Sequence, residues 1–107
     1  MVSQEPFEII YDSETFQHIV AIDRKYHSLI CSTIEEQLSY EPEEETRNRK
    51  PLVRPSEIGA TWELRFGPNN RFRVFYRTDL SNKTVYIRAI ATKLGNKLFI
   101  GTEEFNL

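Results

Sequence analysis

The chain has 107 residues, which is enough for one domain with a single hydrophobic core. Cys31 is its one cysteine, so an intramolecular disulfide is excluded, and we expect this side chain to behave as a small buried hydrophobe. The longest uninterrupted apolar run, residues 19–22, is too short for a membrane-spanning helix or for the apolar region of a signal peptide. We therefore expect a soluble cytoplasmic protein without a membrane partner.

The net charge of −2 hides a strong asymmetry along the chain. Residues 1–45 hold 11 acidic and 2 basic residues, a balance of −9, whereas residues 46–101 hold 12 basic and 3 acidic residues, a balance of +9. Glu103 and Glu104 supply the remaining −2. A basic half is typical of a nucleic-acid-binding surface or of a site that receives an acidic partner. Alternatively, the two halves neutralise each other within the fold, and the sequence leaves both explanations open.

The first half of the chain reads as a strand followed by helix. Residues 7–11 alternate apolar and polar side chains, which predicts a strand. Helical spacing then continues to Leu38, with Ser13 as a candidate N-cap. The pattern does not decide between two helices broken near Asp23 and one bent helix. Residues 41–46 contain a proline and a run of like charges, which end the helical region.

Three further strands are predicted over residues 61–66, 71–78 and 84–91, and their short connections favour antiparallel pairing. The order β-αα-βββ predicts a single α+β domain over residues 1–107, in which a helical hairpin packs on a mostly antiparallel twisted sheet whose other face is free. The residues that we expect in or near the core are Trp62, Leu64, Val74, Tyr76, Val85 and Ile87.

The hairpin formed by the first two of these strands places two arginines face to face. If Phe66 pairs with Phe72, then Arg65 lies directly opposite Arg73, and like charges in such positions destabilise a sheet. An anion between the two guanidinium groups would compensate, and phosphate fits their planar forks. In the alternative register Arg73 opposes Glu63 and forms a surface salt bridge worth about 0–1 kcal/mol. The hairpin alone does not choose between the two.

The element order and three segments resemble the RelE/ParE superfamily of type II toxin–antitoxin toxins, and its RelE-like branch in particular. The segments are the basic stretch TRNRKPL at residues 46–52, the hairpin WELRFGPNNRFRVFY at 62–76 and the closing IRAIATKLGNKLFI at 87–100. The likeness covers nearly the whole chain. It implies a ribosome-dependent messenger RNA endonuclease, or mRNA interferase, that inhibits translation and is held inactive by a cognate antitoxin.

The resemblance also implies roles for individual residues. Arg73 is similar to the family arginine that braces the scissile phosphate, Arg65 stands where catalytic members place a basic residue facing the RNA, and Lys93 matches the basic residue after the last strand. We expect these three to be exposed and to converge on the open face of the sheet. The further basic residues implied to contact RNA are Arg47, Arg49, Lys50, Arg71 and Lys97.

The implied chemistry is cleavage of RNA without a metal. The 2′-hydroxyl beside each phosphate attacks in line, so an enzyme needs mainly to fix that geometry and to stabilise the negative charge that develops. Arginine suits this task because it is always charged and bidentate. No cluster of His, Cys, Asp and Glu in the sequence has metal-ligand spacing, so we expect neither a metal nor another cofactor.

Two residues depart from the pattern of catalytic members. Glu63 stands where RelE proteins tend to carry a lysine, and Phe99 stands where some members carry a tyrosine that moves a proton. We favour a salt bridge with Arg73 as the role of Glu63. Two alternative functions stay open: a ParE-like inhibitor that contacts DNA gyrase and cleaves nothing, and a degenerate member that keeps the fold and antitoxin binding without activity.

Overall fold

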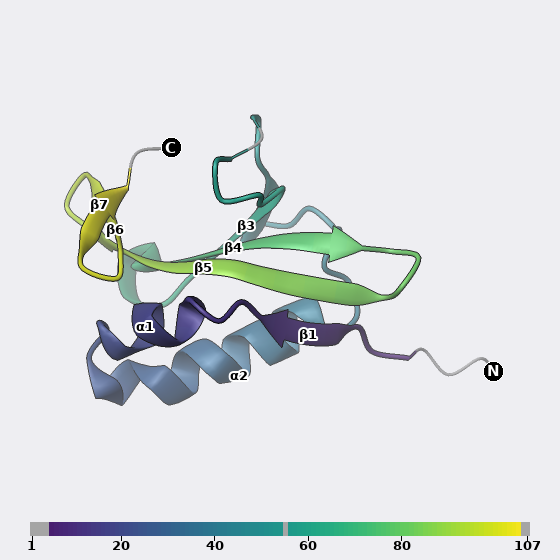
Figure 1. The fold of residues 1–107 in the computed structure, drawn as a ribbon, viewed down its shortest axis with the longest axis horizontal. Helices are drawn as coiled ribbons and strands as arrows, with labels where there is room; N and C mark the ends of the chain where they lie inside the picture. The colour runs from purple at the N-terminus through teal and green to yellow at the C-terminus, as the bar shows by residue number, and fades with distance from the viewer. Residues whose placement is uncertain (1–4, 55, 106–107) are drawn as a thin grey trace.

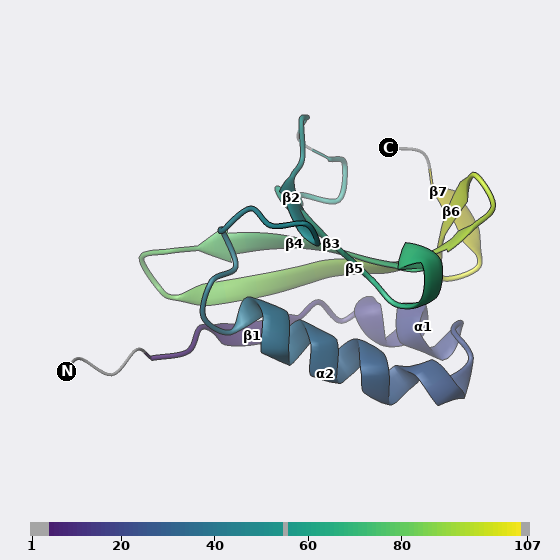
Figure 2. The same cartoon turned by 180° about the vertical axis from the view of Figure 1, so that it is seen from behind.

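The computed structural model describes residues 5–54 and 56–105, and within these residues both helices lie on one face of a seven-stranded sheet (Figures 1 and 2). The elements in chain order are β1 (Glu8–Tyr11), α1 (Thr15–Val20), the 3-10 turn η1 (Arg24–Tyr26), α2 (His27–Leu38), β2 (Arg49–Pro51), β3 (Trp62–Phe66), the 3-10 turn η2 (Pro68–Asn70), β4 (Phe72–Asp79), β5 (Thr84–Leu94), β6 (Lys97–Ile100) and β7 (Glu103–Phe105).

The helical region consists of two helices rather than one bent helix. The chain breaks after α1, and the Asp23 carboxylate accepts a hydrogen bond from the main-chain N–H of Lys25 at 3.1 Å, which starts η1. The prediction of Ser13 as an N-cap is wrong, because Glu14 precedes α1 and makes no side-chain capping bond. Short helices of this kind depend on packing rather than on their own caps.

Helix α2 is anchored to the sheet by a stripe of apolar side chains four residues apart. Ile30, Ile34 and Leu38 are fully buried, as expected for one face of an amphipathic helix. Cys31 is exposed, so its predicted burial is wrong. It follows Ile30 by one residue, a rotation of about 100° that turns its side chain away from the sheet.

The sheet has the strand order β2-β3-β4-β5-β6-β7, with antiparallel neighbours throughout. The long strand β5 uses its remaining edge twice: its first half pairs in parallel with β1, and its second half pairs with β6. The strands β2, β6 and β7 were not predicted, and they have three, four and three residues. The predicted α+β class with a mostly antiparallel sheet is confirmed.

The hairpin of β3 and β4 has the first of the two predicted registers. Phe66 pairs with Phe72, and Arg65 lies opposite Arg73. This parity directs Leu64 and its neighbours at alternate positions toward the helices. The predicted core is confirmed: Leu64, Val74, Tyr76, Val85 and Ile87 are fully buried, and the half-buried Trp62 packs against them.

The opposite face of the sheet is not free, contrary to the prediction. Phe75 on β4 is fully buried there, together with Ala60, Ala89 and Ala91. Leu52 and Ile58 from the loop after β2, and Leu98 and Ile100 from β6, pack against this second cluster. Burial of a phenylalanine is worth about 1.5–3 kcal/mol, which holds the loop and β6 over the sheet. The candidate site residues on this face therefore lie between two covered regions, one under the loop after β2 and the other under β6.

None of the helices within residues 5–54 and 56–105 is long and apolar enough to cross a membrane.

Candidate functional site

The face of the sheet opposite the helices carries a network of two arginines and one glutamate. Arg65 and Arg73 lie opposite each other across β3 and β4, and Glu63 lies two residues before Arg65 on the same face. Arg65 Nε donates a hydrogen bond to Glu63 Oε1, and Arg73 Nη1 lies 3.6 Å from Glu63 Oε2. The two guanidinium groups therefore share one carboxylate, which offsets part of the repulsion between the facing arginines and leaves a net charge of +1.

The three side chains differ sharply in exposure. Glu63 and Arg73 are 2% and 7% exposed, whereas the Arg65 side chain is 44% exposed. Burial lowers the pKa of Arg73, the charge of Arg65 lowers it further, and Glu63 opposes both effects. The expectation that Arg73 is exposed is wrong, because its guanidinium is turned inward to Glu63 and to the carbonyl of Asn70, which accepts from Arg73 Nε at 3.2 Å. Arg65 presents the accessible guanidinium of this network.

Lys93 lies on the same face, on the neighbouring strand. Arg73 pairs with Ala91, and Lys93 follows Ala91 by two residues, so it is a diagonal neighbour of Arg73. Diagonal neighbours in an antiparallel pair are typically about 7–8 Å apart. Lys93 is exposed and makes no ion pair with the described residues. The fold thus brings the three predicted catalytic residues to one face, while Arg73 is tied to Glu63 rather than directed at Lys93.

The basic residues of β2 separate to opposite sides of the sheet. Arg49 is 7% exposed and lies on the helix side, where its Nη1 donates to the carbonyl of Gln37 at 2.6 Å and its Nη2 lies 3.9 Å from Glu41. It connects β2 to the end of α2. Lys50 is exposed and pairs with Glu45 at 3.4 Å. Arg47 is exposed in the loop before β2.

The remaining predicted residues lie beside the turns at one end of the sheet. Lys97 is exposed on β6, opposite Leu94. Arg71 is half-buried, and its guanidinium carbon lies 5.3 Å from the centre of the Tyr26 ring and 5.9 Å from that of Phe72. These distances are typical of cation–π contacts.

A cavity of about 460 Å³ lies where the β3–β4 turn meets the β5–β6 turn, and the sequence did not indicate it. The residues that line it are Pro68, Asn69, Arg71, Lys93, Leu94 and Gly95. The Gly-Pro-Asn-Asn and Gly-Asn sequences mark two turns, but only the pairing of β4 with β5 brings them side by side. A second hollow, of about 650 Å³, lies between α1 and the β6–β7 hairpin, and three glutamates line it: Glu14, Glu103 and Glu104.

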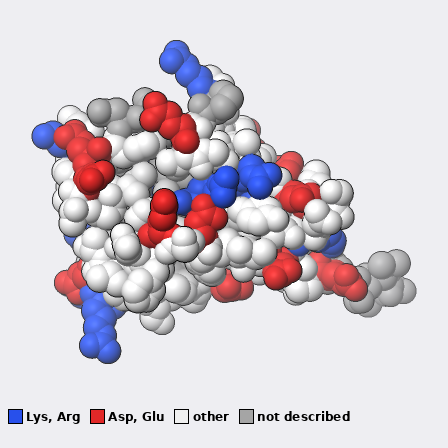
Figure 3. All heavy atoms as spheres, in the orientation of Figure 1, with Lys and Arg blue, Asp and Glu red and all other residues white. Residues whose placement is uncertain are grey.

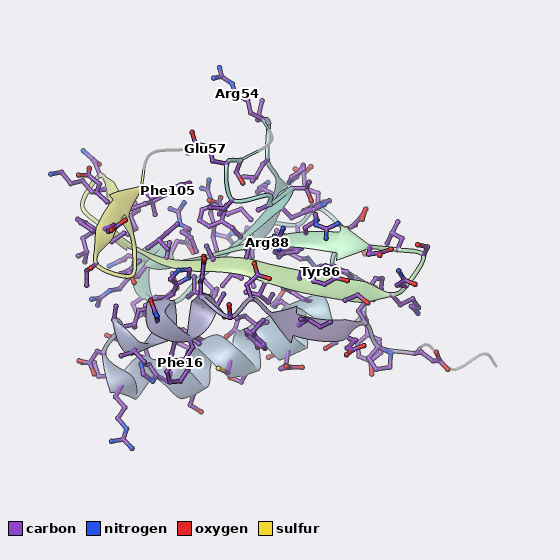
Figure 4. All side chains as sticks on the ribbon, viewed as in Figure 1. Phe16, Arg54, Glu57, Tyr86, Arg88 and Phe105 are labelled. Atoms are coloured by element: carbon purple, nitrogen blue, oxygen red, sulfur yellow. The ribbon has the colours of Figure 1, made fainter. Side chains whose placement is uncertain are left out.

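Charges of both signs lie near each other on the face of the molecule shown in Figure 3. Figure 3 shows basic side chains at the centre of the view with acidic side chains around them, and Arg88 lies in this region in Figure 4. Its guanidinium pairs with Asp12 at 3.0 Å, which joins the basic half of the chain to the acidic half. Together with the Arg49 and Lys50 pairs, this contact shows that part of the charge asymmetry is neutralised within the fold. The described residues contain no group of three His, Cys, Asp or Glu side chains that could hold a metal ion.

A chain of the crystal structure of the toxin–antitoxin complex RelBE2 from Mycobacterium tuberculosis is similar to this chain, with a TM-score of 0.68. The two are 23% identical, and the likeness covers 85% of this chain and 95% of the other. No family model matches the sequence, and no curated protein matches it. At this level of identity the likeness establishes the architecture, as the resemblance of the sequence implied. This chain therefore has the same fold as that chain of the RelBE2 complex.

Proposed function

We propose that this protein is the toxin of a type II toxin–antitoxin system and acts as a ribosome-dependent mRNA endoribonuclease that inhibits translation in the cytoplasm. The observation that carries the proposal is the fold, which is shared over 85% of the chain with a chain of a toxin–antitoxin complex. The partners would be a cognate antitoxin, the ribosome and messenger RNA. The face that carries Arg65 and Lys93 supplies cationic groups suited to an RNA phosphate.

In the proposed reaction the 2′-oxygen of a nucleotide forms a bond to the adjacent phosphorus, and the bond from phosphorus to the 5′-oxygen of the next nucleotide breaks. The 2′-hydroxyl loses its proton, the leaving 5′-oxygen gains one, and the products are a 2′,3′-cyclic phosphate and a 5′-hydroxyl. Negative charge builds up on the phosphoryl oxygens as this happens. Arg65 and Lys93 would contact these oxygens. The buried Arg73 would contribute its positive charge to the site and would keep Glu63 in position through their ion pair.

A second candidate is an inhibitor of DNA gyrase that cleaves nothing. Glu63 favours it, because its carboxylate already compensates Arg65 and Arg73 and thereby reduces the positive charge available to an RNA phosphate. Phe99 also favours it, since this half-buried residue of β6 has no group that transfers a proton. The same two residues favour a degenerate toxin that binds its antitoxin and has no activity.

The test uses Arg65→Ala, because Arg65 is the accessible arginine of the network. Expression of the full chain in bacteria should arrest growth by halting translation, and Arg65→Ala should relieve the arrest by lowering cleavage about 10²–10³-fold, the usual effect of removing one preorganised charge donor. Primer extension on ribosome-bound message measures cleavage, and circular dichroism of the purified variant shows that it remains folded.

The matched control is Arg54→Ala. Arg54 is also an exposed arginine, and Figure 4 shows it projecting from the body of the protein at the tip of the loop after β2. This variant should arrest growth as the wild type does. Arrest with intact message and induction of a DNA-damage response would refute the endoribonuclease and favour the gyrase inhibitor. Absence of arrest by the wild type would favour the degenerate toxin.

A further inference from the structure

We propose that the cavity between the β3–β4 and β5–β6 turns is a phosphate-binding pocket in which Arg71 and Lys93 hold a phosphate group of a single-stranded RNA next to the Arg65 face. The assignment of the phosphate to RNA rests on the proposed function. The pocket itself is inferred from its shape, its charge and the way in which Arg71 is held.

The pocket is concave and of suitable size. Its volume of about 460 Å³ falls within the range of about 300–1,000 Å³ that is typical of small-molecule sites. The main-chain N–H of Lys93 on β5 donates to the carbonyl of Arg71, the residue before β4, at 2.7 Å, and this bond fixes the two cationic residues side by side. A nucleotide is a ligand of matching dimensions.

Uncompensated positive charge distinguishes this pocket from the arginine pair on the sheet. Two cationic side chains line the pocket and no carboxylate does. Across residues 5–54 and 56–105, neither Arg71 nor Lys93 forms an ion pair, whereas Arg65 and Arg73 share Glu63. An anion that approaches this end of the sheet therefore meets two cations without a counter-charge in the pocket, whereas the two arginines on the strands keep a net charge of +1 after Glu63 is counted.

Arg71 is held in place before any ligand arrives. Its guanidinium packs against the rings of Tyr26 and Phe72, and these contacts restrict the side chain without using its hydrogen-bond donors. An oxyanion is the strongest acceptor available to a guanidinium. The site is thus preorganised for a phosphate.

The position of the pocket relates it to the proposed reaction. Lys93 lies at the border between the pocket and the face that carries Arg65, because it is also the diagonal neighbour of Arg73. An RNA strand whose scissile phosphate lies between Arg65 and Lys93 would place a neighbouring phosphate in the pocket between Lys93 and Arg71, so that Lys93 lies between the two phosphates. The pocket would then fix the register of the strand, which is what in-line attack requires.

The first experiment is a titration of the ¹⁵N-labelled protein with inorganic phosphate, followed by NMR. Saturable shifts are expected at the amides of Asn69 and Gly95, which lie in the two turns of the pocket, and not at those of Glu63 and Arg65. Lys93→Gln should weaken binding at least tenfold, as is usual when a charged hydrogen-bond donor is removed. Lys83→Gln, which removes the same charge from the turn at the other end of β4 and β5, should leave the affinity unchanged.

The second experiment replaces phosphate by a four-nucleotide RNA with 2′-O-methyl groups, which cannot be cleaved by 2′-attack. It should shift the same two amides, bind more tightly than phosphate and displace it. Phosphate binding without oligonucleotide binding would overturn the assignment to RNA and indicate a small phosphorylated molecule. Absence of saturable shifts in the pocket, or equal weakening by Lys83→Gln and Lys93→Gln, would overturn the pocket.

The growth-arrest and binding experiments together distinguish failure of the pocket from failure of the proposed function. Growth arrest by message cleavage, combined with no phosphate binding in the pocket, would refute the pocket and leave the endoribonuclease intact. Binding of phosphate and oligonucleotide in the pocket, combined with no growth arrest, would support the pocket and refute the endoribonuclease.

Discussion

Glu63→Gln should destabilise the protein much more than a surface substitution does. Glu63 is 2% exposed and Arg73 is 7% exposed, so removal of the carboxylate charge leaves a buried guanidinium without a counter-charge. Breaking a buried ion pair from one side costs about 3–5 kcal/mol. Domains of this size are stable by about 5–15 kcal/mol in total, so the loss is a large fraction of the stability.

Urea denaturation measures the effect directly. With an m-value of about 2 kcal/mol/M, the expected loss moves the midpoint of unfolding down by about 1.5–2.5 M. Arg65→Ala is the matched control, because it removes the other arginine that contacts Glu63. The Arg65 side chain is 44% exposed, and its loss should cost no more than about 1 kcal/mol.

A double variant separates the buried pair from other effects of the substitution. Glu63→Gln combined with Arg73→Met removes both charges, and it should recover most of the lost free energy of unfolding because no isolated charge stays buried. If Glu63→Gln lies within about 1 kcal/mol of the wild type, or if the double variant is no more stable than Glu63→Gln alone, the buried ion pair is not what holds Arg73 in place.

Three further predictions concern single groups. Burial lowers the pKa of His18 from its ordinary value of 6.5, so the unfolded chain binds this proton more readily than the folded protein does. The contribution of the neutral ring to stability is therefore complete above about pH 6.5, and it is lost as the pH falls through the pKa of the folded state. Urea midpoints measured from pH 7.5 to pH 5 should therefore fall, and less steeply in His18→Gln. Tyr76→Phe should cost about 1–3 kcal/mol, because the buried hydroxyl donates at 2.6 Å to a main-chain carbonyl in the loop before β2, and thermal unfolding would show it. Gly67→Ala should cost more than Gly95→Ala: both have positive φ, of 86° and 63°, but the new Cβ at Gly67 would lie 2.6 Å from the Phe72 ring, whereas nothing lies within 4 Å at Gly95. Equal melting temperatures for the two glycine variants would show that the Phe72 ring moves aside freely.

The sequence was most informative where structure is local. The strands β3 and β4 and the face that each of their side chains takes follow from the alternation, which is readable in the chain, whereas the choice between the two registers came from the structure. The short strands β2, β6 and β7 were missed because segments of three or four residues carry too little alternation. The exposure of Cys31 was also missed, because one position on a helix separates a buried side chain from an exposed one.

The candidate site was predictable in its residue types but not in their accessibility. The placement of Arg65 opposite Arg73 was one of two registers that the hairpin allowed, and the pairing of Glu63 with Arg73 was anticipated. The burial of Arg73 depends on what covers this face of the sheet, and Arg49 is buried because the end of α2 lies beside β2. Such contacts join residues far apart in the chain, and no local pattern records them.

The parallel pairing of β1 with β5 has a consequence for how the chain folds. Glu8 pairs with Thr84, 76 positions later, and the intervening residues include both helices and three strands. Contacts between residues so far apart carry a high entropic cost of loop closure and slow folding. During synthesis β1 has no partner until β5 has been made, and β6 completes the same edge of β5 later still. The native sheet, and with it any activity of this surface, can therefore form only after β5 and β6 have been translated.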